Sequence, residues 1–242
     1  MRTQEEKYIK EKISEIQYLQ LIQEGIFCFG GDDQDQSMKE LQRKNDLDCW
    51  IQKANSLFPK INKSIHDAMI NSNIKNFSPT NISEEAFWAY FHNENAIFRL
   101  ACLWDVLAQM CNEYFELGFE ITKVNYKVIF NGKKCSSNNE EFIKIQNEIS
   151  TYFKEKDDTN TKNIDDIWKG NHTFISNIRN KFTHRNDPHI VHFFNNANNP
   201  SEQINFPNHP IYELKRITED YFKCYSFMKN VNALMIKKYG SL

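Results

Sequence analysis

The chain has 242 residues, of which 40% are hydrophobic and 14% aromatic, which is enough for a sizeable core in one domain. Its seven glycines and six prolines are too few for an all-β protein built on many tight turns. The formal net charge of −2 excludes the overall basic character of a non-specific nucleic-acid binder, so any contact with RNA must be local.

The cysteines show no Cys-x-x-Cys pair and no regular framework. The six are Cys28, Cys49, Cys102, Cys111, Cys135 and Cys224. We therefore expect reduced thiols, as in a cytoplasmic protein, rather than disulfides. The chain starts with a charged segment unlike a signal peptide, and it has no run of about 18 apolar residues that could span a bilayer. The sequence thus predicts a cytoplasmic protein without a membrane partner.

Three amphipathic helices are predicted between residues 3 and 73. The first covers residues 3–24, opens with a capping box, and has Gly25 as a plausible terminating residue. The second starts near Ser37 with another capping box. Pro59 permits a third helix to start, because proline is tolerated in the first turn of a helix.

Residues 83–117 form the strongest helical pattern of the chain, which Gly118 closes. The length of this pattern allows a break near His92. One face is apolar and the other is a polar stripe, composed of Asn95, Arg99, Asp105, Gln109 and Asn112. This stripe could line a functional cleft, with Arg99 as a phosphate contact. We favour the alternative, a solvated or dimer-facing surface with ordinary hydrogen bonds.

Residues 121–130 alternate between apolar and polar positions and are rich in β-branched side chains, and Asn131-Gly132 follows as a tight-turn dipeptide. The pattern predicts a short strand, a hairpin arm or an extended crossover. Because a single strand cannot make a sheet, we expect a small insertion in a helical protein.

The remaining elements are predicted to be helical. Amphipathic patterns cover residues 138–156 and 164–185, with Gly170 as a potential break in the second. Residues 186–209 form a connection longer than most loops in compact domains, as in lids or dimer arms. The last helix begins at Pro210 and ends at Gly240.

The end of the helix over residues 164–185 carries the most informative pattern. Its apolar stripe consists of Phe174, Ile175, Ile178 and Phe182. At about 100° per residue, Asn180 and His184 lie together on the side away from this stripe, with Arg179 on its flank. Pro188 should end the helix at about Asn186. A histidine near the free carbonyls of a last turn can exchange protons near neutral pH.

The motif Arg179-Asn180-x-x-x-His184 resembles that of the HEPN superfamily (higher eukaryote and prokaryote nucleotide-binding domains). The segment from Arg99 to Gln109 also looks like a central helix of small stand-alone bacterial HEPN proteins. The resemblance implies an antiparallel helical bundle that is usually dimeric and cleaves RNA without a metal. It also implies a role in toxin–antitoxin or defence systems, with an antitoxin as a further partner.

On this hypothesis His184 acts in proton transfer and Arg179 binds the phosphate. Asn180 would hold the imidazole tautomer or contact the phosphate, and Asn95, Arg99 and Asp105 would support the site. One histidine cannot easily serve as both base and acid. A homodimer would supply a second histidine, and no metal or cofactor is expected.

Three alternatives remain open from the residues. Arg179 and His184 could simply pair with neighbours on a surface helix. The chain could be a non-catalytic dimerisation or nucleotide-binding scaffold of the same fold. A zinc site could use His184, His189, His192 and Asp187, although their spacing fits no metalloprotease or zinc-finger pattern.

The sequence therefore predicts a single all-α domain over residues 1–242. Helices of residues 3–73 would pack on a HEPN-like bundle of about 83–240, with a short extended or hairpin insertion near 121–135.

Overall fold

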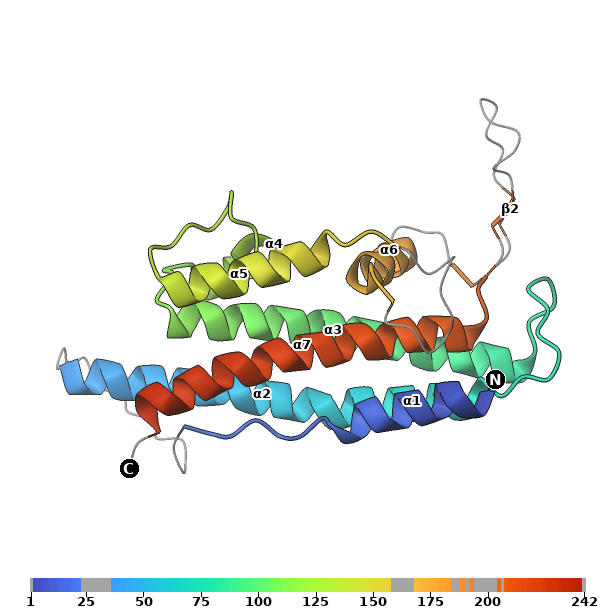
Figure 1. The fold of residues 1–242 in the computed structure, drawn as a ribbon, viewed down its shortest axis with the longest axis horizontal. Helices are drawn as coiled ribbons and strands as arrows, with labels where there is room; N and C mark the ends of the chain where they lie inside the picture. The colour runs from blue at the N-terminus through green and yellow to red at the C-terminus, as the bar shows by residue number, and fades with distance from the viewer. Residues whose placement is uncertain are drawn as a thin grey trace. The chain divides into compact units, whose positions relative to one another are not determined.

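The computed structural model describes residues 2–22, 36–157, 168–183, 188–189, 192–193, 204–205 and 207–240. The fold is all-α, as predicted (Figure 1). Its helices are α1 (Arg2–Ser14), α2 (Gln36–Asn71), α3 (Glu84–Tyr114), η1 (Ile121–Lys123), α4 (Tyr126–Ile129), α5 (Glu140–Phe153), α6 (Asn171–Thr183) and α7 (Pro210–Tyr239). Among the described residues, no helix combines the length and the apolar character needed to cross a bilayer.

The chain divides into two compact units. The first unit comprises Met1–Glu15, Lys60–Leu100 and Phe153–Phe222, and the second comprises Ile16–Pro59, Ala101–Tyr152 and Lys223–Leu242. Helices α2, α3 and α7 each contribute residues to both units. Each unit therefore takes segments both from residues 3–73 and from residues 83–240.

The core of the first unit is formed by apolar side chains from five helices. It includes Ile9 of α1, Ile61 and Ile65 of α2, Ile97 and Leu100 of α3, Ile175 and Ile178 of α6, and Leu214 and Ile217 of α7. Burying each of these side chains is worth about 1.5–3 kcal/mol, and this term holds α6 against its neighbours.

In the second unit the core is built around Trp104 of α3, which is 1% exposed. Its ring stacks on Tyr152 of α5 at 6.1 Å and meets Phe227 of α7 at 6.3 Å between ring centres. Helix α5 was predicted from its apolar periodicity, which buries Phe142, Ile145 and Ile149.

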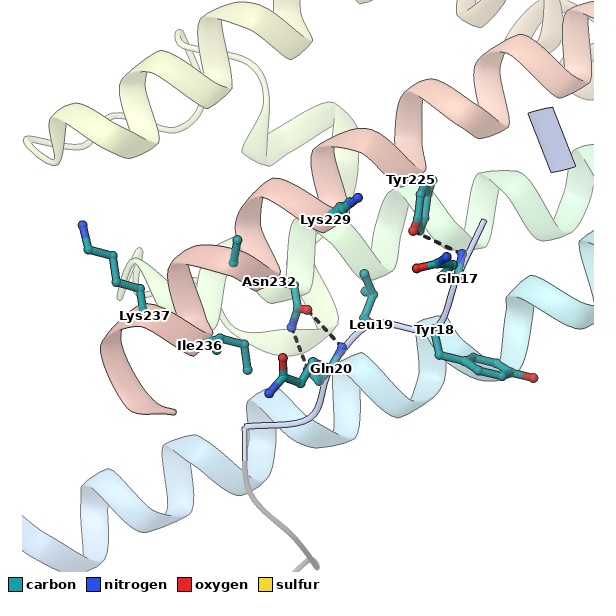
Figure 2. A pocket seen from close by; sticks show the side chains of 10 residues that line it. Gln17, Tyr18, Leu19, Gln20, Tyr225, Lys229, Asn232, Ile236 and Lys237 are labelled. Carbon is teal, nitrogen blue, oxygen red and sulfur yellow. Dashed lines mark hydrogen bonds between the residues drawn. The ribbon is translucent and has the colours of Figure 1, made fainter. Parts of the chain in front are cut away.

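The first helix ends at Ser14, not near residue 24 as predicted from the sequence. Residues 16–21 are not helical, because side chains of α2 and α7 satisfy their backbone groups in place of helical hydrogen bonds. Figure 2 shows the α7 contacts, in which the amide of Asn232 both donates to and accepts from Gln20. On α2, the side-chain amide of Asn55 likewise accepts from the N–H of Leu19 and donates to its carbonyl. The carboxylate of Asp48 accepts from the N–H of Ile22. No local pattern could predict these partners.

Two predicted helix boundaries are wrong. Pro59 lies inside α2, where Phe58 and Ile61 on either side are almost fully buried and their packing holds the helix together. Helix α3 also continues without a break past His92. There the side chain of Asn93 is fully buried and donates to the carbonyl of Pro210 at 3.0 Å.

The extended or hairpin insertion predicted near 121–135 is also wrong, because η1 and α4 occupy that stretch. The side chain of Asn125 caps α4 by accepting from the N–H of Val128 at 3.2 Å. The carboxylate of Asp105 accepts from the N–H of Tyr126 at 3.0 Å. These two caps favour a helical turn over the extended conformation that the alternating pattern suggested.

The last helix begins at Pro210 and is followed by Gly240, as predicted. In the connection before it, β1 (His192–Phe193) and β2 (Ile204–Asn205) pair antiparallel, with His192 opposite Asn205. The sequence did not predict this pairing. The predicted start of α6 near Ile164 lies outside the described residues.

Candidate functional site

Helix α6 carries Arg179 and Asn180 of the predicted motif and begins directly after Gly170. Gly170 has φ +74°, and an added Cβ would lie 2.7 Å from the backbone nitrogen of Asp157, so a side chain cannot be accommodated. The side-chain amide of Asn171 donates to the Trp168 carbonyl and to a carboxylate oxygen of Glu219, each at 2.7 Å. These bonds fix the start of α6 to α7.

Arg216 of α7 is fully buried and holds the same region. Its guanidinium donates to Asp157 Oδ1 at 2.6 Å, Tyr212 Oη at 2.9 Å, Lys169 O at 3.1 Å and Asn171 Oδ1 at 3.2 Å. It also lies 4.7 Å from the ring centre of Phe174 on α6. A buried charge is tolerated only with such partners, because its desolvation is costly.

A buried charge pair adjoins Arg216 on α7 and is formed by Lys215 and Glu219. Lys215 Nζ is 3.6 Å from Glu219 Oε1 and 4.0 Å from the ring centre of Trp168. Burial raises the pKa of Glu219, and the charge of Lys215 partly offsets this effect. Tyr8 of α1 donates its hydroxyl to Glu219 at 3.3 Å, and burial and that carboxylate raise the pKa of Tyr8.

The first turn of α6 contains His172, a residue that the sequence analysis did not single out. His172 is 6% exposed, and its Nδ1 lies 3.3 Å from Oδ1 of the buried Asp220. Its Nε2 lies 3.3 Å from Oγ of Ser176, and the ring of Phe153 stacks on the imidazole at 3.9 Å. The i, i+4 spacing of His172 and Ser176 was visible in the sequence, but the pairing with Asp220 was not.

Arg179 and Asn180 occupy the second half of α6, and both are half-buried. Neither side chain makes a hydrogen bond or ion pair with any residue that the structure describes. An arginine whose side chain has no counter-ion among the described residues is suited to binding an anion. His184, the third residue of the motif, lies outside the described residues.

The supporting residues predicted on α3 belong to different units and have different hydrogen-bond partners. Arg99 donates to both the carbonyl (2.8 Å) and the side-chain oxygen (3.0 Å) of Asn95, within the first unit. Asp105 lies in the second unit and caps α4 through Tyr126. Gln109, on the same polar stripe, donates to a carbonyl of the adjoining segment at 2.9 Å. The C-terminal half of the stripe thus makes the ordinary hydrogen bonds of the alternative interpretation, but it is not solvated, because Gln109 and Asn112 are buried.

His189 lies close to α6 and is engaged by protein groups. Its Nε2 is 2.9 Å from Oε2 of Glu213, and its ring stacks on Tyr90 at 3.9 Å. The metal alternative also involves His184, Asp187 and the side chain of His192, which lie outside the described residues. Within the described part of the chain, no group of three or more His, Cys, Asp or Glu side chains could hold a metal ion.

The N-terminal half of α3 carries an aromatic surface, which we call the α3 aromatic stripe. Its members are Phe87, Trp88, Phe91 and Phe98, all of which are more than a third exposed. Phe98 contacts Phe182 of α6 at 6.1 Å between ring centres. Exposed patches of large apolar side chains are typical of interaction surfaces. The stripe therefore adjoins the helix that carries Arg179.

A separate pocket of about 450 Å³ lies in the second unit, between residues 17–20 and α7 (Figure 2). Lys229, Asn232 and Lys237 line it, but none of the predicted site residues does. The amide of Asn232 is already used by Gln20, so this wall serves the chain's own extended segment.

No family model, no curated protein and no solved structure matches the chain. The fold and the site define the class as an all-α protein in which a half-buried Arg–Asn pair lies on a firmly anchored helix.

Proposed function

We propose that the chain is a HEPN-type, metal-independent endoribonuclease of the cytoplasm, acting as a toxin or in defence. The proposal rests on the burial of the Arg179 and Asn180 side chains and on their lack of partners among the described residues. Both side chains are half-buried on a helix anchored by buried hydrogen bonds, yet neither has a partner among the described residues. A guanidinium and an amide placed in this way suit the oxygens of a phosphodiester.

The proposed reaction is attack of the ribose 2′-oxygen on the adjacent phosphorus, with departure of the 5′-oxygen. Arg179 would stabilise the charge on the phosphate, and His184 would take part in proton transfer. Asn180 would orient the phosphate or the imidazole of His184. Such chemistry needs no metal, because the proton carriers and the positive charge come from side chains.

We further propose that two copies of the chain associate through the α3 aromatic stripe. The stripe exposes four large aromatic side chains, and its member Phe98 contacts Phe182 on the motif helix. Association there would bring two α6 helices near one another and supply a second His184. RNA would then bind across the pair, and an antitoxin could bind the same face.

A different function is supported by one observation. Glu84 and Glu85 begin α3 beside the α3 aromatic stripe, and the chain has no overall positive charge. These features favour a protein partner over nucleic acid at that stripe. A non-catalytic dimerisation or nucleotide-binding scaffold of the same fold is therefore the second candidate.

The test is cleavage of RNA by the purified chain in EDTA. We expect the wild type to cleave, and Arg179→Ala and His184→Ala to lose at least about 100-fold in rate. Lys181→Ala is the matched control, because Lys181 is an exposed cation on the same helix. Cleavage that survives both motif substitutions would refute the site. Absence of cleavage from every RNA tested would favour the scaffold.

A further inference from the structure

The pocket of the second unit lies between the extended residues 17–20 and the C-terminal half of α7 (Figure 2). Its volume of about 450 Å³ falls within the range of roughly 300–1,000 Å³ that small-molecule sites occupy. Both walls belong to the same unit. The side chains that α7 contributes are Tyr225, Lys229, Asn232, Ala233, Ile236 and Lys237. The pocket is therefore of a size to hold a small organic molecule.

Both walls of the pocket are held in place by the chain itself. The N–H of Gln17 donates to Oη of Tyr225 at 3.1 Å. The side-chain amide of Asn232 accepts from the N–H of Gln20 at 3.1 Å and donates to its carbonyl at 2.9 Å. Leu19, between these two residues of the extended segment, is buried. Because the walls are formed without a ligand, a ligand does not lose affinity by ordering them.

The lining of the pocket is positively charged. Among the described residues that form it there are two lysines, Lys229 and Lys237, and no aspartate or glutamate. Neither lysine makes a hydrogen bond, an ion pair or a ring contact with any residue that the structure describes, and Figure 2 shows both ammonium groups clear of the other labelled side chains. The other lysines of α7 are engaged, since Lys215 forms an ion pair while Lys223 and Lys238 lie over aromatic rings. The pocket thus holds the two α7 lysines whose charge is available to a ligand.

The two lysines lie at the ends of an apolar stretch. Lys229, Ala233 and Lys237 follow one another at i, i+4 and i+8 on one row of α7, so the first and the last are about 12 Å apart along the helix. Ala233 and Ile236 line the pocket between them in the sequence, and Leu19 lines the other wall. Bringing both ammonium groups to a single anion would force like charges together. The spacing therefore favours two anionic groups, one at each end of an apolar body.

We propose that this pocket binds a small organic dianion, with a carboxylate or a phosphate group at each end of an apolar body. Lys229 and Lys237 each bind one anionic group, since an ammonium group pairs with carboxylate and phosphate alike. The apolar body lies over Ala233 and Ile236. Because both lysines are exposed, the affinity falls as the salt concentration rises. Binding here is independent of the proposed function, because the lining comes from residues 17–20 and α7.

The test is isothermal titration calorimetry of the full chain with decanedioate, with the bisphosphate of decanediol and with decanoate. Decanoate has the same apolar chain as decanedioate but one anionic group. We expect at least one of the two dianions to bind about fivefold more tightly than decanoate, because a second exposed ion pair forms. The tighter of the two identifies the anionic group. Equal affinities for all three probes would overturn the proposal, and so would an absence of binding by both dianions.

Substitutions locate the binding site. Lys229→Gln and Lys237→Gln each remove one charge from the pocket, and Lys238→Gln is the matched control, because it removes an exposed charge of α7 outside the lining. Each pocket variant should bind the tighter dianion as weakly as the wild type binds decanoate, whereas the control should keep the wild-type affinity. Ala233→Phe fills the middle of the pocket and should abolish binding, while the circular dichroism of the chain stays unchanged because Ala233 is exposed. Equal losses in Lys238→Gln and in the pocket variants would reveal general charge attraction and refute a site here.

Discussion

Replacing Arg216 by methionine should destabilise the protein strongly. The guanidinium is fully buried, and its hydrogen bonds include those to Lys169 and Asn171, which fix the start of α6. Methionine fills a similar volume but leaves these acceptors without a donor. Removing one partner from a buried ionic network costs about 3–5 kcal/mol. In a chain of this size that lowers the melting temperature by about 6–20 °C.

The measurement is urea unfolding of Arg216→Met beside Asp157→Asn. Asp157 accepts a hydrogen bond of 2.6 Å from Arg216, but its side chain is 48% exposed, so its charge contributes only about 0–1 kcal/mol. The arginine variant should thus lose several times more stability than the aspartate variant. Equal losses, or a loss below about 1 kcal/mol for Arg216→Met, would show that the buried network does not hold α6.

Three further predictions concern other parts of the chain. Asn232→Ala should lower the free energy of unfolding by about 1–3 kcal/mol, because two hydrogen bonds to the backbone of Gln20 are lost. The amide of Gln20 should also exchange its hydrogen faster, and an unchanged exchange rate would contradict this prediction. Because burial raises the pKa of Glu219 in the folded state, its contribution to stability should fall as pH rises above about 4.5. The free energy of unfolding of the wild type minus that of Glu219→Gln should therefore decrease as the pH rises. An increase of this difference with pH would contradict a raised pKa. Trp88→Glu should turn a dimer into a monomer in light scattering, since it places a charge within the α3 aromatic stripe; a dimer that persists would place the interface elsewhere.

The periodicity of apolar residues predicted those helices whose conformation does not depend on contacts with distant parts of the chain. Helices α5 and α7 follow from apolar residues at helical spacing, which the structure buries. The predictions that were wrong depend on partners distant in the chain. Residues 16–22 satisfy the backbone through Asn55 and Asn232, and Tyr126 finds its cap on Asp105. In each case a tertiary contact outweighs the local preference of the sequence.

The same distinction between local and distant contacts applies to the residues of the candidate site. The sequence could place Arg179 beside Asn180 because both lie within one helix, where spacing determines which side chains share a face. The contacts of His172 with Asp220, and of Arg216 with Asp157, join distant segments, so no spacing could predict them. The sequence did contain a signal, since α7 carries Glu213 and Asp220 among buried apolar residues. Buried charges in an amphipathic helix indicate partners on facing elements.

If the proposed function holds, the electrostatics of α6 make Arg179 the main attraction for a phosphate there. Arg179 and Asn180 lie near the C-terminal end of the helix, whose free carbonyls carry partial negative charge and disfavour a phosphate. The chain as a whole is not basic either. Attraction of a phosphodiester must then come from local donors on the polar face of α6. In the proposed reaction, His184 follows this end of α6 in the sequence, and a protonated histidine there would gain from the dipole; that would suit His184 as the acid and leave the role of base to another residue.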